Sequence, residues 1–350
     1  MTQDRLNHIF SNYKDLKIAV LGDLCLDRYL EIDPAHAETS IETGLPVHNI
    51  VRVRSQAGAA GTILNNISAL GVGEIVPVGF HGCDGEGFEL QEALKALPGV
   101  RLDHVQATKL RRTFTYTKPL VIRPGLPPEE LSRFDIKNWT PTPQSLSQEL
   151  ARSLEAVAED CDALIVMDQV DQAGTGVITD EVLQSLKRIA AARPDLCIIA
   201  DSRNGLRKFP ACHYKMNATE LAAMQDSAAL QGAVDCAPAA QRLAAEIGHA
   251  IFVSMSEHGI LYAAPEGAPH HVPALPLRGP IDVVGAGDCV TANLAAAIAA
   301  RATHREAMEL AMLACSHVVH QLGTSGSASL VEIAALLAHA GCTRNVGSHS

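Results

Sequence analysis

The sequence predicts an α/β protein built on a doubly wound, mostly parallel sheet flanked by helices, with a small β lid. Short apolar runs alternate along the chain with longer segments of helical periodicity. The runs are apolar almost throughout, as expected for parallel strands that helices cover on both faces. Two more polar stretches interrupt this alternation and supply the lid.

Strand and helix predictions follow each other in the order that a doubly wound sheet requires. The strands of the main sheet are Lys17–Asp23, Glu74–Gly79, Ala163–Asp168, Leu196–Asp201 and Ala250–Met255. The helices are Ala59–Leu70, Glu86–Leu97, Pro143–Glu159, Val177–Ala192, Ala218–Ala229, Ala239–Ile247, Ala286–Ala300 and Arg305–Gln321.

The two polar stretches are Tyr29–Arg54 and Gln106–Ile136, where sequences such as VHNIVRVR alternate in polarity. Each is predicted to supply strands of an accessory sheet. That sheet is either a lid over an active site or an extension of the edge of the main sheet. We predict one domain over residues 1–340, with these segments inserted, and a frayed tail over residues 341–350.

Composition restricts the class of protein. Of 350 residues, 47% are apolar, and 28 basic against 39 acidic residues give a net charge of −11. This charge argues against binding to nucleic acid or to an anionic membrane, since both require a basic surface. The nine cysteines form no CxxC pair, and no apolar signal segment precedes the first strand. We expect reduced thiols and a cytoplasmic location.

The strongest local motif is Gly285-Ala286-Gly287-Asp288, which opens an apolar helix. The start of a helix presents unpaired N–H groups, and glycines allow an anion to approach them. Asp288, in the first turn, is placed to take a proton from an attacking hydroxyl. Alternatively, Asp288 caps the helix and the glycines only turn the chain. A dinucleotide-binding oxidoreductase is disfavoured, because the third glycine of GxGxxG is missing.

Other candidates are ambiguous by residue type alone. Asp168 and Asp201 end predicted strands, where ligands bind in α/β sheets but turns also form. Asp27 suits sugar hydroxyls, because a carboxylate only accepts hydrogen bonds, or it is a surface loop acid. Asn217 and Glu220 have the spacing of a helix capping box. His270-His271 and the pair His317 and His320 lack a third metal ligand, so we interpret them as surface histidines.

A basic set, Lys109, Arg111, Arg112 and Lys118, lies in the second polar stretch. It either binds a phosphate carried by the substrate or forms a solvated edge of alternating charge. We predict the phosphate pocket, because an acidic protein needs local cations to bind a dianion.

Five segments in order resemble the PfkB, or ribokinase-like, carbohydrate kinases. They are VLGDLCLDRY, AGAAGTILNNISALG, MNATE, SMSEHG and IDVVGAGDCVTANLAAAI, and the resemblance spans residues 15 to 335. Within the family, the segments GDLCLDRY, ETGLPV, NNISALG and LGTSGSASLVEI are most similar to heptose 7-phosphate kinases, specifically to the kinase half of the bacterial ADP-heptose synthesis protein.

The resemblance implies roles for particular residues. Asp288 is the expected general base, and the amides of Gly285, Ala286 and Gly287 form the expected anion hole. The expected sugar-binding residues are Asp27, Gly58, Asn65, Asn66 and Lys118. The expected nucleotide-binding residues are Asp201, Asn217, Glu220, Ser254, Ser256 and Gly259.

The resemblance also implies ATP and Mg²⁺ as cofactors, with a monovalent cation as a further candidate. Asn217 and Glu220 are expected to organise Mg²⁺ through water. The expected partners are a sugar or sugar phosphate and a second copy of the chain, joined through the lid.

The chain departs from the family pattern at four places. Val284 replaces a threonine, and Ala57-Gly58 replaces a glycine pair. Asp171 occupies the place of a lysine, and Met312 that of an asparagine. The sequence therefore predicts an ATP-dependent sugar or sugar-phosphate kinase similar to heptose 7-phosphate kinases. The alternative is a catalytically silent protein of the same fold that binds a sugar or nucleotide.

Overall fold

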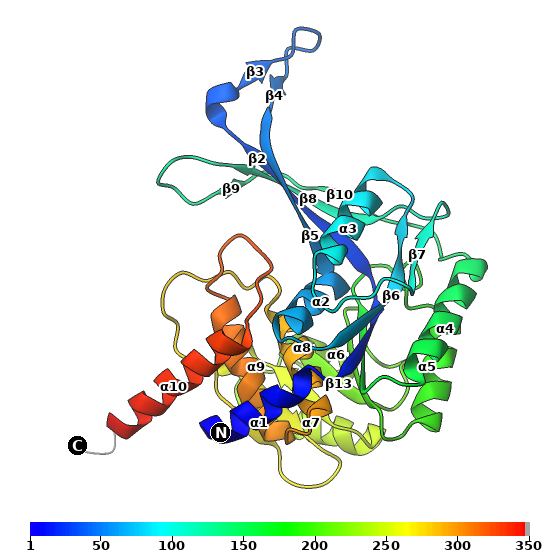
Figure 1. Ribbon diagram of the computed structural model, residues 1–350, viewed down its shortest axis with the longest axis vertical. Coiled ribbons are helices and arrows are strands. Elements are labelled where there is room, and N and C mark those ends of the chain that lie inside the picture. The colour runs from blue at the N-terminus through cyan, green and yellow to red at the C-terminus, as the bar shows by residue number, and fades with distance from the viewer. Residues whose placement is uncertain (347–350) are drawn as a thin grey trace.

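The computed structural model describes residues 1–346, and the side chains of residues 1–339. Nine strands form the main sheet in the order β16-β15-β14-β13-β12-β11-β1-β6-β7 (Figure 1). All pairings from β7 to β14 are parallel, whereas β14–β15 and β15–β16 are antiparallel. The predicted doubly wound, mostly parallel sheet is confirmed. The strands are β1 (Lys17–Gly22), β6 (Glu74–Gly82), β7 (Val105–Thr108), β11 (Ala163–Asp168), β12 (Cys197–Ser202), β13 (His213–Asn217), β14 (Ile251–Ser254), β15 (Ile260–Ala263) and β16 (His270–Val272).

Helices cover both faces of this sheet, and each face has its own apolar core. Within β1, Ile18 and Val20 belong to one core, while Ala19 and Leu21 belong to the other. This alternation is the period-2 geometry of a strand buried on both faces. One core includes α1 (Gln3–Tyr13), α2 (Ala60–Ala69), α8 (Ala286–Ala299) and α9 (His304–Val318). The other includes α4 (Gln144–Ala158), α5 (Asp180–Ala192), α6 (Ala218–Met224) and α7 (Gly232–Ile247).

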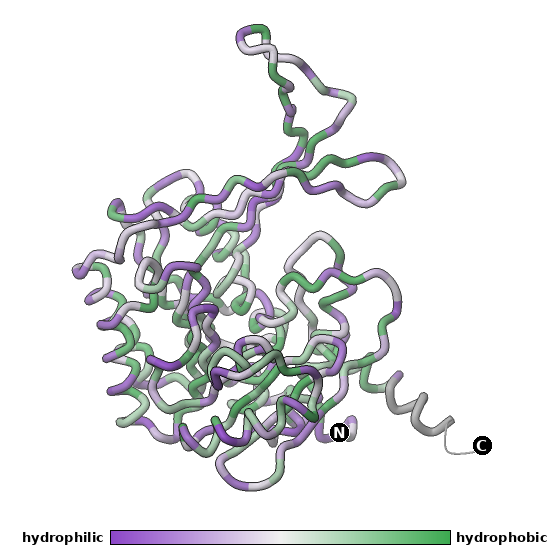
Figure 2. The backbone as a smooth tube through the Cα atoms, turned by 180° about the vertical axis from the view of Figure 1, so that it is seen from behind, coloured by the Kyte–Doolittle hydropathy of each residue, from purple (hydrophilic) through white to green (hydrophobic). Residues whose placement is uncertain are grey.

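A separate five-stranded sheet stands beside the main one (Figure 1). It consists of β2 (Leu24–Ile32), β5 (Ile50–Ala59), β8 (Phe114–Val121), β9 (Glu129–Glu130) and β10 (Phe134–Ile136). The hairpin of β3 (Glu38–Thr39) and β4 (Pro46–Val47) extends from it, away from the body of the molecule (Figure 2). Most strands of the two polar stretches thus share one small sheet, while β3 and β4 pair only with each other.

The structure corrects several predicted boundaries. Residues 106–108 belong to β7 of the main sheet, and the lid strands β2 and β5 reach Leu24 and Ala59, beyond the predicted limits. Two elements lie outside the predicted set: α1, and β13, in which Lys215 interrupts the apolar pattern.

The predicted tail begins inside a helix. α10 (Leu330–Val346) includes residues 341–346 of the predicted tail, and residues 347–350 lie outside the described part of the chain. The backbone N–H of Ser329 donates to Glu332, which caps this helix at 2.7 Å. In residues 1–346, no helix is both long and apolar enough to cross a membrane.

Candidate active site

The start of α8 lies at the carboxyl edge of the main sheet. Gly285 is the N-cap, with φ +79°, a conformation in which glycine is unstrained. The Ala286 amide donates to the Val283 carbonyl at 3.2 Å. The amides of Gly285, Gly287 and Asp288 have no acceptor within the described residues. The backbone N–H groups available to an anion therefore differ from the expected set. Asp288 contributes one, whereas the N–H of Ala286 is used in the turn.

A buried ion pair lies directly below this helix start. Lys215 Nζ is 2.8 Å from Asp201 Oδ2, and Thr291 Oγ1 donates to the same oxygen at 3.1 Å. A β-carbon on Gly287 would come within 3.1 Å of Lys215 Nζ. Glycine at 287 thus lets the ammonium approach the helix start, where it adds positive charge to that of the helix dipole.

Asp288 belongs to a cluster of interacting charges. Its pKa is raised to about 7, mainly by burial and next by the Asp201 charge, while Lys215 and Arg203 act in the opposite direction. Asp27 of the lid also interacts with Asp288. The chain thus brings together residues from β2, β12, β13 and α8. A carboxyl group with a pKa near neutrality is suited to general-base chemistry.

On the lid, Asp27 faces Gly58 and Lys118. A β-carbon on Gly58 would lie 2.7 Å from Asp27 Oδ2, so glycine is required to leave room for the carboxylate. Lys118 Nζ lies 3.6 Å from Asp27 Oδ1 and donates to the Tyr29 hydroxyl at 3.4 Å. Burial raises the pKa of Asp27, and Lys118 lowers it. The three predicted residues therefore form one arrangement at the base of the lid.

The two predicted asparagines differ in their surroundings. Asn66 is buried and donates to the carbonyls of Thr62 and Gly326, so its amide nitrogen ties α2 to the loop before α10. Asn65 is half-buried on the same helix. Thr62, one turn earlier, lies 3.3 Å from a β-carbon placed on Gly285, so α2 packs directly against the start of α8.

Asn217 and Glu220 form a capping box at the start of α6. The Glu220 amide donates to Asn217 Oδ1 at 2.9 Å, and the Asn217 amide donates to Glu220 Oε2 at 2.7 Å. Burial raises the pKa of Glu220, and Asp201, Lys215 and Arg203 are near enough to influence it. The box holds the Glu220 carboxylate near Asp201 and Lys215. We call this part of the carboxyl edge of the main sheet, beside the start of α8, the catalytic edge.

Whether these residues fit Mg²⁺ follows from their chemistry. Carboxylate oxygens of Glu220, Asp201 and Asp288 are of the type that Mg²⁺ prefers. Within the described residues, however, no group of three or more acidic, histidine or cysteine side chains has the geometry of a metal cage. The donor types of these carboxylates, although not a complete cage, fit Mg²⁺.

The predicted nucleotide segment after β14 is shaped by close backbone contacts. Gly259 has φ +87°, and a β-carbon there would lie 2.2 Å from the Val272 carbonyl oxygen. Ser256 also has a positive φ, 51°, and Ser254 donates to the Met216 carbonyl at 3.4 Å. Ser254 pairs with Asn217 in the sheet register, so this segment adjoins the capping box.

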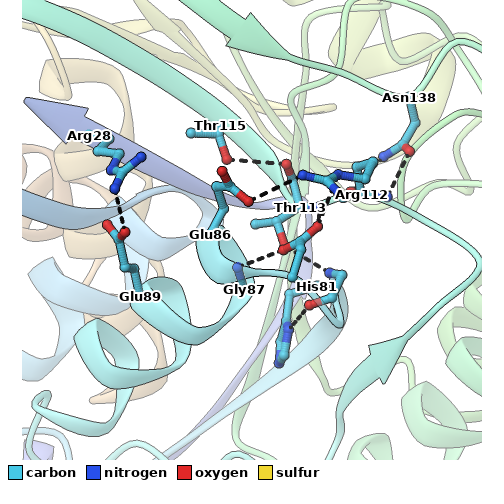
Figure 3. Close-up of polar contacts among 11 residues, drawn as sticks. Arg28, His81, Glu86, Gly87, Glu89, Arg112, Thr113, Thr115 and Asn138 are labelled. Atoms are coloured by element: carbon cyan, nitrogen blue, oxygen red, sulfur yellow. Dashed lines mark hydrogen bonds and ion pairs between the residues drawn. The ribbon is translucent and has the colours of Figure 1, made fainter.

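The basic set of residues 109–118 does not form one pocket. Arg112 contacts Asp84 at 3.3 Å and Glu86 at 3.3 Å, as Figure 3 shows for Glu86. Arg111 donates to Thr140 at 2.9 Å and to the Pro141 carbonyl. Only Lys118 reaches Asp27. Arg111 and Arg112 thus bond to protein groups away from Lys118, and a phosphate pocket at these two residues stays a prediction.

Sequence reasoning missed two cations of the site. Lys215 is buried in β13 and is visible in the sequence only as the residue two positions before Asn217. Arg203 follows β12, and in the amide orientation that satisfies both side chains it donates to the Gln169 oxygen at 2.6 to 3.1 Å. The available signal was that each cation stands two positions from a predicted site residue, Lys215 from Asn217 and Arg203 from Asp201.

Comparison with known proteins places this chain in a family of enzymes. Residues 142–330, more than half of the chain, match the model of the pfkB family carbohydrate kinases. The chain belongs to this family and is a carbohydrate kinase.

Two curated relatives carry the name bifunctional protein HldE. That of Gluconobacter oxydans is 30% identical over 88% of this chain, and the match covers 62% of its own length. That of Hyphomonas neptunium is 29% identical over 98% of this chain and 68% of its own length. The chain thus spans less than two thirds of the Gluconobacter protein.

Solved structures share the fold at low sequence identity. Escherichia coli phosphofructokinase-2 in complex with substrates and products has a TM-score of 0.70 at 17% identity, covering 93% of this chain and 99% of its own. Arabidopsis thaliana ribokinase complexed with ribose and ATP has a TM-score of 0.65 at 18% identity, covering 92% and 98%. The ribokinase-like fold predicted from the sequence is confirmed.

Proposed function

We propose that this chain transfers the γ-phosphoryl group of ATP to a hydroxyl of a sugar phosphate, with heptose 7-phosphate as the first acceptor to test. The observation that carries the proposal is Asp288 in the first turn of α8, beside three open amides and the Lys215 ammonium. Phosphoryl transfer is catalysed mainly by positioning and by charge stabilisation.

In this proposal, Asp288 accepts the proton of the attacking hydroxyl. The amides of Gly285, Gly287 and Asp288, together with Lys215, stabilise the charge on the transferring group. Glu220 and Asn217 would hold Mg²⁺ through water, and the ion would supply positive charge that offsets the phosphate charge. Asp201, Ser254, Ser256 and Gly259 lie along the edge where the nucleotide binds, and Asp27 accepts hydrogen bonds from sugar hydroxyls.

Four lid cations support a phosphorylated acceptor. Arg54 and Lys118 lie 4.7 and 4.9 Å from the centre of the Tyr29 ring. Arg133 and Lys137 lie 5.3 and 5.9 Å from that of Tyr116. In the strand register Asp27 is opposite Tyr116, and Tyr29 is opposite Lys118, so these side chains share one face of the lid. Each of these cations also pairs with a carboxylate, namely that of Glu31, Asp27, Asp135 or Asp171. A phosphate on the sugar would therefore compete with these acids for the four cations.

The opposite face of the lid supports a homodimer. Val53 pairs with Leu30, and Phe134 pairs with Thr117, which places both on the face away from Asp27. Val51, Val53 and Phe134 are 54%, 47% and 66% exposed. An apolar strip of this kind is suited to pairing with the same strip on a second copy.

An ADP-release assay tests the function. Heptose 7-phosphate, fructose 6-phosphate and ribose are offered with ATP, with and without Mg²⁺. We expect Mg²⁺-dependent ADP release, fastest with a phosphorylated sugar. Preference for the unphosphorylated sugar would contradict the acceptor assignment. Binding of ATP without ADP release on any acceptor would favour the catalytically silent alternative.

A further inference from the structure

A cavity adjoins the catalytic edge. It has a volume of about 610 Å³ and lies between α5, α6 and the loop that follows β12. Asp168, Arg203 and Glu220 line both this cavity and the catalytic edge, while Phe209 and Met224 form part of an apolar wall. None of the predicted sugar-binding residues lines it.

Three cations from one short loop line the cavity. Arg203 is bonded to Gln169 as described above. Arg207 donates to Asp226 at 2.8 Å and to the Ala223 carbonyl at 3.0 Å, and both members of this ion pair are exposed. Such a pair is weak, so a ligand can replace it. Lys208 has no hydrogen bond or ion pair within the described part of the chain.

The acids of the cavity wall are largely engaged. Asp168 accepts from Ser202 at 2.7 Å and from Asn204 at 3.2 Å. Glu220 accepts from the Asn217 amide. Asp180 is exposed at the start of α5. The side chains that can bind a ligand are therefore those of Arg207 and Lys208, which lie next to the apolar wall.

We propose that this cavity binds a small phosphate ester whose other end is apolar or aromatic. Arg207 and Lys208 bind the phosphate, since a guanidinium grips a phosphate with two parallel hydrogen bonds. The apolar end packs against Phe209 and Met224. The binding site stands on its own geometry. Its influence on catalysis, through the shared residues Asp168 and Glu220, rests on the proposed function.

Phenyl phosphate is a suitable probe. Its binding is measured in the Asp288→Asn variant, which lacks the proposed base, so that catalysis does not contribute to the measurement. Calorimetry should show tighter binding of phenyl phosphate than of inorganic phosphate. The double change Arg207→Ala and Lys208→Ala should weaken binding about tenfold or more. Lys187→Ala, on the exposed surface of α5, is the matched control and should leave binding unchanged.

Two further variants decide where the probe binds. Ala223→Phe fills the cavity, and binding should be lost while the melting temperature is retained. Gly287→Val blocks the start of α8, and binding should persist. The proposal is overturned if binding survives Ala223→Phe, or if it is lost only with Gly287→Val, since the probe would then occupy the catalytic phosphate site. Because the probe is not a substrate, a failure here leaves the kinase proposal untouched.

Discussion

Lys215 and Asp201 form a 2.8 Å ion pair under the start of α8, and the two side chains are 6% and 9% exposed. Removing one partner of a buried pair leaves the other uncompensated, at a cost of roughly 3–5 kcal/mol. Lys215→Met should therefore destabilise the fold and lower kcat about 10²-fold, by analogy with loss of one oxyanion donor.

Urea unfolding and steady-state kinetics separate these two effects. Lys215→Arg keeps the charge and should recover stability more fully than kcat, because the guanidinium has a different shape. Normal kcat in a destabilised Lys215→Met variant would assign the lysine a structural role only.

Asp288→Asn should lower kcat by roughly 10²–10⁴-fold while ATP binding is retained. The amide keeps the size of the side chain and removes the base. ADP release and calorimetric titration with ATP measure the two quantities. Unimpaired turnover would leave Asp288 as a first-turn helix residue without a catalytic role.

The rate should depend on pH through Asp288, whose pKa burial raises to about 7. The base acts only when ionised, so kcat/KM should rise as pH increases through about 7 and level off above it. A profile measured from pH 5.5 to 9 at saturating Mg²⁺ tests this. A flat profile over that range would be inconsistent with this carboxylate as the base.

Gly58→Ala should weaken sugar binding, because the added β-carbon would lie 2.7 Å from the Asp27 carboxylate. We expect KM for the acceptor to rise about tenfold with little change in KM for ATP, since one hydrogen-bonding group is displaced. Gly85→Ala is the matched control, because a β-carbon there meets no atom within 4 Å. Equal effects of the two changes on acceptor KM would argue against a role for Asp27.

Stability should fall in mild acid because of His213, at the opposite end of β13 from the catalytic edge. Burial lowers its pKa to about 4, with contributions from His304 and His249. The pKa of this histidine is lower in the folded protein than the unfolded value of 6.5. The folded state therefore loses stability as pH falls from about 6.5 to about 4. Over this pH range, the free energy of unfolding of the His213→Asn variant should fall by about 2–3 kcal/mol less than that of the parent protein. Chemical denaturation at pH 7 and pH 4.5 measures the difference.

The sequence determined five parallel strands of the main sheet, most of the helices that flank it and the glycine-opened helix that carries Asp288, because apolar period and glycine spacing act over short distances. The partners of the charged groups were decided only by tertiary structure. Arg111 and Arg112 stand near Lys118 in the chain, yet the fold bonds them to Pro141 and Asp84. Lys215 interrupts the apolar pattern of a strand, and only the parallel pairing of β12 with β13 brings it to Asp201. The position of a charged side chain relative to its partner is set by strand order and register. Both depend on contacts between residues far apart in the chain.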